Sequence, residues 1–203
     1  NTIVIFSSDN GPERYAYARD LKHGHWSAHP LRGLKRDLYE GGHRMPFIVR
    51  WPGVTPAGRV SDALVSQIDL MATLAAVVGD ALPPNAAEDS HDLLPLLQGR
   101  SESVRTTHVH NTNANGYAIR HGDWVLINAK DGYVSARDAA WERRHGYPPD
   151  DDGPVELYNL RTDLAQKHNV AAAHPEKVAE LQALLQRIRE QGHSAPRFNP
   201  AQK

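Results

Sequence analysis

Asp9 and Asn10 directly follow a short apolar run at residues 2–6. The run is rich in β-branched residues and predicts a strand, and ligands of open α/β sheets bind beyond the carboxyl ends of strands. Adjacent side-chain oxygens at this place suit a hard cation such as Ca²⁺. Because Ca²⁺ takes about six to eight oxygen ligands, the pair would supply only part of its shell. A turn is the simpler interpretation of Asp-Asn-Gly alone, because Asn-Gly is a strong hairpin signal.

Lys35 is a second candidate, in a strongly basic stretch of the chain. It ends Leu31-Arg32-Gly33-Leu34-Lys35 and precedes Tyr39-Glu40-Gly41-Gly42 by four residues. Taken alone, a lysine in a loop is a solvated charge. Residues 13–50, however, carry eight Lys/Arg against four Asp/Glu, a local charge of +4. This excess suits an anionic substrate, and a solvated surface is the alternative interpretation.

His23, His25 and His29 crowd the polar segment before this lysine. Alternating histidines can bind a metal ion. No carboxylate or cysteine completes a convincing ligand set around them, so a substrate-facing or merely exposed position is the preferred interpretation. Further along, the glycines of Glu40-Gly41-Gly42-His43-Arg44 allow positive φ and close backbone approach. This segment is interpreted as a structural turn that Glu40 and Arg44 brace by pairing.

The first half of the chain must position these residues with strands and a helix. Residues 2–6 predict a strand covered on both faces, as in a parallel sheet, and residues 46–51 predict a second one. Residues 7–30 are interpreted as a long loop. Ser66 and Asp69 resemble a capping box, which opens a helix that ends at Gly79. Its apolar stripe is Ile68, Met71, Leu74 and Val78. Residues 92–98 predict a short helix or turn, and residues 99–103 are the best boundary.

The second half has a different pattern. Residues 117–120, 124–128 and 155–160 are strand candidates, with a tight hairpin at His121-Gly122-Asp123. Residues 136–153 are charged and proline-rich and are interpreted as an excursion. Pro175 opens a helix with Val178, Leu181, Leu185 and Ile188 on one face, up to Gly192. The pattern predicts a small antiparallel sheet with one long amphipathic helix.

Composition excludes several classes of protein. The chain has 203 residues, a net charge of −1, 40 % hydrophobic residues and no cysteine. This charge gives no bias towards nucleic acid or a membrane surface, and the lack of cysteine rules out disulfides and zinc–thiolate sites. No apolar run approaches the roughly 20 residues that span a bilayer. We find no signal peptide, and because the chain opens inside a predicted buried strand, its true N-terminus is expected upstream.

Together these segments resemble the arylsulfatase branch of the alkaline-phosphatase superfamily. The resemblance is carried by Ser8-Asp9-Asn10-Gly11, by the Leu-Arg-Gly-x-Lys that ends at Lys35, by Glu-Gly-Gly-x-Arg-x-Pro at residues 40–46, and by Trp51-Pro52-Gly53. It continues more weakly through residues 116–124 and 156–160. The resemblance implies an α/β fold: the end of an alkaline-phosphatase-like sandwich with a small C-terminal antiparallel sheet and a long helix. Residues 1–100 would complete the catalytic α/β domain, and residues 101–203 would form a C-terminal α+β subdomain.

The same resemblance implies roles for individual residues. Asp9 and Asn10 would bind one Ca²⁺ ion that is shared with a missing N-terminal half. Lys35 would contact the sulfate group as a catalytic and substrate-binding residue, because an ammonium ion stabilises oxygen charge as the S–O bond breaks. His43 is a further candidate for substrate contact. No family role follows for Arg32 or Arg36.

Sulfatases carry a formylglycine nucleophile on a Cys-x-Pro-x-Arg or Ser-x-Pro-x-Arg motif, and this chain has neither. The nearest match, Ser194-Ala195-Pro196-Arg197, has its arginine one place early. We therefore expect the C-terminal portion of a formylglycine-dependent sulfatase that is inactive alone. Its expected partners are the missing half and a sulfated small molecule or glycan, with no nucleic acid. The family implies a periplasmic or secreted location.

Two rival interpretations remain. A phosphatase or phosphonate hydrolase of the same superfamily could use a related scaffold, and zinc or manganese dependence would distinguish it. Alternatively, the chain is a non-catalytic remnant that binds calcium or a protein partner.

Overall fold

A computed structural model describes residues 2–112, 116–149 and 153–196. The chain forms two compact units: unit 1 comprises residues 1–6, 48–108 and 184–203, and unit 2 comprises residues 7–47 and 109–183. The four predicted site residues, Asp9, Asn10, Lys35 and His43, all belong to unit 2. Residues 150–152, at the end of the expected excursion, and Arg197 of the near-match to the nucleophile motif lie outside the described residues. The division of the intact protein near residue 100 stays a prediction.

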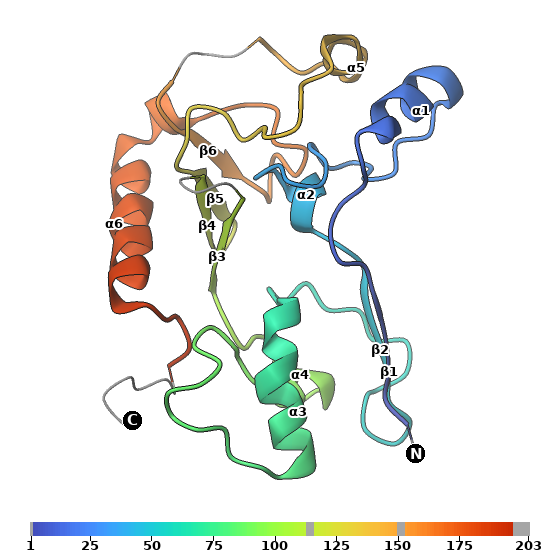
Figure 1. Ribbon diagram of the computed structural model, residues 1–203, viewed down its shortest axis with the longest axis vertical. Coiled ribbons are helices and arrows are strands. Elements are labelled where there is room, and N and C mark those ends of the chain that lie inside the picture. Colours follow the sequence, from blue (N-terminus) through green and yellow to red (C-terminus); the bar gives the residue numbers. More distant parts are fainter. Residues whose placement is uncertain (1, 113–115, 150–152, 197–203) are drawn as a thin grey trace. The chain divides into compact units, whose positions relative to one another are not determined.

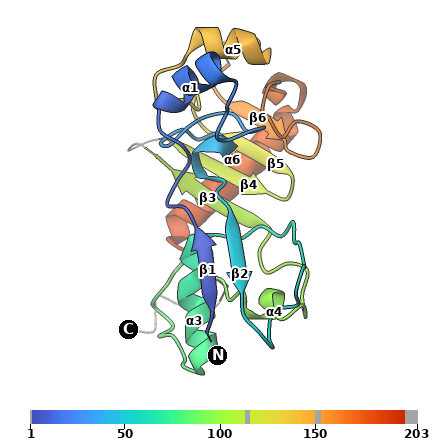
Figure 2. The same cartoon turned by 90° about the vertical axis from the view of Figure 1, so that its right-hand side faces the viewer.

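A two-stranded sheet of β1 (Val4–Ser7) and β2 (Phe47–Arg50) lies mostly in unit 1. Figure 2 shows the two strands side by side, running in opposite directions. Both strands were predicted. In this chain Val4 is 50 % and Phe6 61 % exposed, and the expected cover of the first strand on both faces in the intact protein stays a prediction. Among the described residues β1 pairs with β2 alone, so the wide sheet that would bury it is not present.

The predicted capping box and helix are confirmed. Asp69 Oδ2 accepts a hydrogen bond from Ser66 N at 2.8 Å, and η1 (Gln67–Asp69) leads into α3 (Leu70–Val78). The predicted apolar stripe is nevertheless exposed: the four side chains have exposed fractions from 46 % to 75 %, namely Ile68, Met71, Leu74 and Val78. Ala72 and Thr73 are buried instead, because Ala72 N donates to Ser90 Oγ and Thr73 Oγ1 accepts from Leu93 N. The predicted short helix is α4 (Leu94–Leu97).

A four-stranded sheet lies mostly in unit 2, in the order β3 (Thr107–Asn111), β4 (Tyr117–His121), β5 (Trp124–Ile127) and β6 (Glu156–Asn159). β4 pairs antiparallel with β5, and His121 stands opposite Trp124. Gly122 turns this two-residue hairpin with a φ of 60°. β5 in turn pairs antiparallel with β6, with Val125 opposite Tyr158. The predicted hairpin and antiparallel sheet are confirmed, whereas β3 was not predicted.

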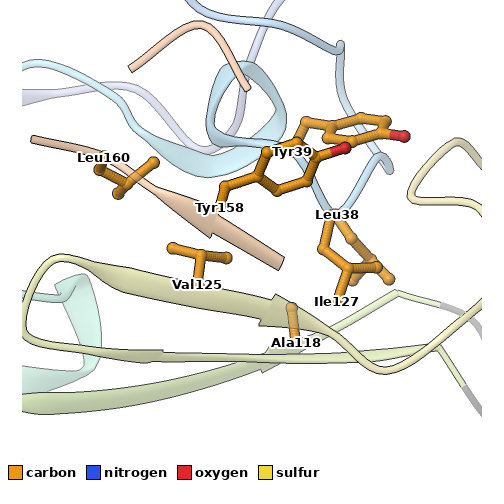
Figure 3. Packing of buried hydrophobic residues seen from close by; sticks show 7 residues of the cluster. All are labelled: Leu38, Tyr39, Ala118, Val125, Ile127, Tyr158 and Leu160. Carbon is orange, nitrogen blue, oxygen red and sulfur yellow. The ribbon is translucent and has the colours of Figure 1, made fainter. Parts of the chain in front are cut away.

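The core of unit 2 joins this sheet to the segment that carries the candidate lysine (Figure 3). Leu38 and Tyr39 are 1 % and 0 % exposed and belong to one cluster with five sheet or sheet-end residues, namely Ala118, Val125, Ile127, Tyr158 and Leu160. Leu38 N also donates to Gly132 O at 2.8 Å. The end of the lysine loop is therefore fixed to the sheet by apolar packing and by backbone hydrogen bonding.

Two helices correct the expectation of unstructured segments. α1 (Tyr15–His23) forms inside the expected loop at 7–30, and α5 (Ala139–His145) forms inside the expected excursion. Figures 1 and 2 show them side by side. Tyr17, Trp26 and Trp141 form an aromatic cluster with ring centroids 4.4–5.4 Å apart, in which Tyr17 and Trp26 are stacked. Each helix alone is short, so this aromatic cluster supplies the tertiary packing that stabilises both.

The remaining elements are α2 (Glu40–His43), η2 (Ala171–Ala173) and α6 (Pro175–Gln191). α6 is the predicted long helix, in which Leu181 and Leu185 are 0 % and 2 % exposed and after which Gly192 has a φ of 73°. α2 was expected only as a turn. Among the described residues no helix is long and apolar enough to cross a membrane.

Candidate active site

Backbone hydrogen bonds bring the three predicted motifs together in unit 2. Gly11 N donates to Gly42 O at 2.9 Å, and Lys35 N donates to Pro12 O at 3.0 Å. The contact between the Asp-Asn-Gly turn and the Gly41–Gly42 turn requires glycine at position 11. A Cβ on Gly11 would lie 1.9 Å from the carbonyl oxygen of Gly41. Gly11 and Gly42 are 31 positions apart in the sequence, and the fold brings their backbones into hydrogen-bond contact.

Asp9 and Asn10 lie just beyond the end of β1. Asp9 is exposed and Asn10 is half-buried. Among the described residues, Asp9 Oδ1 accepts one hydrogen bond, from Ser8 Oγ at 3.5 Å, and Ser8 Oγ also donates to Asn10 O at 3.1 Å. The carboxylate and the amide oxygen therefore keep lone pairs for a hard cation.

These donors fit part of a calcium shell. The described residues contain no group of three or more His, Cys, Asp or Glu side chains that could hold a metal ion. A calcium ion at Asp9 and Asn10 would consequently need further oxygen ligands from water, substrate or another polypeptide segment.

Both backbone polar groups of Lys35 are hydrogen-bonded. Its N–H donates to Pro12 O, and its carbonyl oxygen accepts a hydrogen bond from Ser135 Oγ at 3.0 Å. The side chain is 35 % exposed, and its Nζ lies 3.0 Å from Glu13 Oε1. This hydrogen bond lowers the pKa of Glu13, so the carboxylate stays charged beside the ammonium ion. Sequence reasoning missed Glu13, although it follows Asp-Asn-Gly-Pro directly.

Asp37 shapes the loop that presents Lys35. It is 4 % exposed, and its carboxylate accepts hydrogen bonds of 2.8 Å from three backbone N–H groups, those of Leu34, Val134 and Ser135. Burial raises the pKa of Asp37 against the opposing effect of these bonds. One buried carboxylate thus fastens the lysine loop to the segment at 134–135.

Arg32 secures the start of the same loop from inside the core. It is 4 % exposed, its Nε donates to Tyr133 Oη at 3.1 Å, and its Nη1 donates to Tyr158 Oη and to Gln166 O. The guanidinium carbon also lies 4.1 Å from the ring centre of Tyr39. No signal in the sequence separates this buried arginine from a solvated one, because most of its partners lie about 100 residues or more further along the chain.

His43 ends α2, and its ring contacts a histidine ring of β3 at a tilted angle. The ring centroids of His43 and His110 are 3.8 Å apart, and His110 Nε2 lies 3.2 Å from Leu38 O. Burial lowers the pKa of His110, which keeps this ring neutral. The predicted pairing of Glu40 with Arg44 is confirmed by a 3.0 Å salt bridge. His23, His25 and His29 are exposed.

Comparison with known proteins identifies the family. Residues 1–80 match the sulfatase family model. An N-acetylgalactosamine-6-O-sulfatase of Bacteroides thetaiotaomicron is 38 % identical over 93 % of this chain and 36 % of the relative. Human arylsulfatase A is 34 % identical over 99 % of this chain and 40 % of the relative. The chain belongs to the sulfatase family. This sulfatase chain therefore spans about 36–40 % of the length of these two curated relatives.

Solved structures support the same family and fold. A Bacteroides thetaiotaomicron structure, reported with the metabolism of multiple glycosaminoglycans, has a TM-score of 0.74 and 37 % identity, over 94 % of this chain and 39 % of that one. A Pseudoalteromonas sulfatase has a TM-score of 0.71 at 23 % identity over 96 % of this chain and 39 % of that one, which bears on the fold alone. The expected end of an alkaline-phosphatase-like sandwich, with a small antiparallel sheet and a long helix, is confirmed for the sulfatase chain.

Proposed function

We propose that this chain forms the C-terminal part of a sulfatase that hydrolyses sulfate esters. The observation that carries the proposal is the convergence of the Asp9–Asn10 turn, the Lys35 loop and the Gly41–Gly42 turn through backbone hydrogen bonds. In this proposal an oxygen pair suited to a hard cation and an ammonium group suited to an anion belong to one site. Membership of the sulfatase family supports the choice of sulfate as that anion.

In this proposal each residue has a defined task. Asp9 and Asn10 supply two oxygen ligands to calcium, which when bound would act as a Lewis acid on sulfate oxygens. Lys35 holds the sulfate group and stabilises the charge that develops on its oxygens. His43 borders the substrate. The nucleophile, formylglycine in this family, comes from a segment that this chain does not contain.

The substrate and location are proposals as well. The bacterial relative named N-acetylgalactosamine-6-O-sulfatase makes a 6-O-sulfated amino sugar a suitable first substrate to assay, beside simple aryl sulfates. We also propose that the enzyme acts in the periplasm or outside the cell, which fractionation of cells producing the full-length protein would test.

The test compares ester classes and metals in the full-length protein. We expect 4-nitrophenyl sulfate to be hydrolysed in the presence of calcium, and 4-nitrophenyl phosphate to be hydrolysed far more slowly. Preferential turnover of the phosphate ester, with dependence on zinc or manganese, would instead support a phosphatase. An absence of turnover of all these esters by the correctly modified full-length protein would support a non-catalytic role.

A further inference from the structure

Glu13 stands between two cations at the candidate sulfate site. Its Oε1 lies 3.0 Å from Lys35 Nζ, and its Oε2 lies 3.5 Å from Arg36 Nη1. The carboxylate therefore uses one oxygen for each positive group. Neither the sequence motifs nor the proposed calcium ligands include Glu13 or Arg36.

The pairing of Glu13 with Lys35 is supported by a second attachment between the same two segments. Lys35 N donates to the carbonyl oxygen of Pro12, the residue before Glu13, at 3.0 Å. The two segments are therefore joined by a backbone hydrogen bond and by a side-chain salt bridge. Together these contacts fix both the backbone and the ammonium group of Lys35. An unrestrained lysine side chain has several rotatable bonds, and a displacement of about 1 Å at a reacting centre can lower a rate about 100-fold.

Arg36 supplies the charge that this arrangement would otherwise lose. Lys35 and Glu13 together are neutral, and a neutral pair attracts an anionic ester weakly. With Arg36 the three side chains carry one net positive charge. Arg36 also has a φ of 82°, in the left-handed region that residues other than glycine seldom adopt. The fold keeps an arginine in a backbone conformation better suited to glycine.

We infer that Glu13 is a positioning residue that holds the Lys35 ammonium ion for the sulfate group, while Arg36 keeps the three-residue cluster positive. This inference rests on the proposed function of Lys35. The salt bridge between Glu13 and Lys35 is partly exposed, and such pairs contribute little to folding stability. We therefore assign Glu13 to the orientation of Lys35 and not to the stability of the fold.

A double-mutant cycle in the full-length enzyme tests the inference, with 4-nitrophenyl sulfate as the probe. Glu13→Ala should lower kcat about ten-fold, and Lys35→Ala should lower it about 10²–10³-fold. If Glu13 acts through Lys35, the double variant should be no slower than Lys35→Ala alone. Additive losses would overturn the inference, because they would mean that Glu13 acts independently of the lysine.

The chain offers a matched control in Lys177 and Glu180, another lysine–glutamate pair, on the surface of α6. Glu180→Ala should leave kcat and KM unchanged. Glu13→Ala and Glu180→Ala should have the same melting temperature within about 2 °C, since exposed salt bridges contribute at most about 1 kcal/mol. A large fall in melting temperature for Glu13→Ala would show a structural role and overturn the positioning role.

The outcomes separate the inference from the proposed function. Normal kinetics for Lys35→Ala would contradict the proposed role of the lysine itself. A slow Lys35→Ala enzyme with a normal Glu13→Ala enzyme would contradict the inference alone. Arg36→Gln completes the test: it should raise KM several-fold with little change in kcat, and an unchanged KM would remove Arg36 from the cluster.

Discussion

At the scale of single residues, Lys35 combines a fixed backbone with a charged side chain that is still 35 % exposed. Its N–H and its carbonyl are both bonded, to Pro12 and Ser135, so the fold decides where the side chain starts. Electrostatic catalysis depends on such preorganisation, because groups that are already oriented lose little free energy on meeting the transition state.

Lys35→Ala is therefore expected to lower kcat of the full-length enzyme by about 10²–10³-fold, with a smaller effect on KM. Steady-state kinetics on 4-nitrophenyl sulfate provide the measurement. Lys22→Ala is the control, because Lys22 is an exposed lysine on α1 of the same unit. Turnover of Lys35→Ala close to that of the control would remove Lys35 from the active site.

Asp9 and Asn10 are adjacent and carry side-chain oxygens of different charge. Asp9→Ala and Asn10→Ala should each lower bound calcium and activity together, with the larger effect from the charged residue. Metal analysis of the purified full-length protein measures the stoichiometry, and Asp62→Ala, at an exposed aspartate in unit 1, is the control. Unchanged calcium in both site variants would assign these residues to an ordinary turn.

Glu156 predicts a pH dependence of stability. It is 6 % exposed in β6, accepts a hydrogen bond from Tyr39 Oη at 3.0 Å, and burial raises its pKa from 4.5 to about 7. A raised pKa means that the folded state binds more protons than the unfolded state between these values. The stability that protonated Glu156 contributes to the folded state is therefore fully present below pH 4.5. It is lost as the pH rises through about 7.

Glu156→Gln should remove this pH dependence, because the amide keeps a carbonyl acceptor for Tyr39 and does not ionise. At pH 8 the variant should be more stable than the wild type by roughly 3 kcal/mol, the equivalent of the pKa shift. Melting temperatures between pH 4.5 and 8 measure the effect, and Glu176→Gln is an exposed control. Parallel curves for Glu156→Gln and the wild type would show that Glu156 is ionised throughout.

At the scale of elements, the turn after β1 and the start of α2 are packed backbone against backbone. Gly11→Ala should destabilise the protein by about 1–3 kcal/mol, because its Cβ would overlap the carbonyl of Gly41 and force the two turns apart. Activity should fall further than stability alone explains, since the turn carries Asp9 and Asn10. Gly58→Ala is the control: its φ of 72° disfavours alanine, but nothing lies within 4 Å of the added Cβ. Equal effects of the two substitutions, in melting temperature and kcat, would contradict the packing argument.

Elements coded by neighbouring residues could be predicted from the sequence. The capping box at Ser66, the hairpin at Gly122 and the long helix from Pro175 all follow local rules, and the structure contains them. Local signals for α5 also exist, namely the N-cap Asp138, which accepts from Ala140 N and Trp141 N, and the left-handed Gly146. The charged and proline-rich composition around them concealed the helix.

Other features could not be predicted because they depend on distant parts of the chain. The buried position of Arg32 is created by Tyr133, Tyr158 and Gln166. The lysine loop has its shape because Asp37 bonds to residues 134 and 135. The sequence of α3 predicts the helix from its apolar periodicity. Which face of the helix is buried depends on the segments that pack against it, and the predicted apolar face is exposed.

At the scale of the whole molecule, unit 1 leaves many large apolar side chains uncovered. β1 and β2 expose Val4, Phe6 and Ile48, and α3 exposes Met71 and Val78, each by half or more of its surface. Exposed apolar patches mark sites of association, and the edge of a short sheet can pair with another strand. The chain spans 36–40 % of the length of the two curated relatives. In the proposed full-length sulfatase, we expect a segment outside this chain to cover these side chains.

The chain of 203 residues by itself should be catalytically silent, since it has neither cysteine nor the serine motif that could carry the nucleophile. The measurement is sulfate release from 4-nitrophenyl sulfate with calcium, first by the chain alone and then with the remaining segment of the enzyme added as a separate, formylglycine-containing polypeptide. We expect activity only from the mixture, together with a fall in aggregation by light scattering as the apolar faces become covered. Replacing Met71 and Val78 with serine should reduce the aggregation of the chain alone.

Sulfate release by the chain alone would contradict the assignment of the nucleophile to another segment. A stable monomer that gains nothing from the added segment would instead mean that these apolar faces do not serve to bind it.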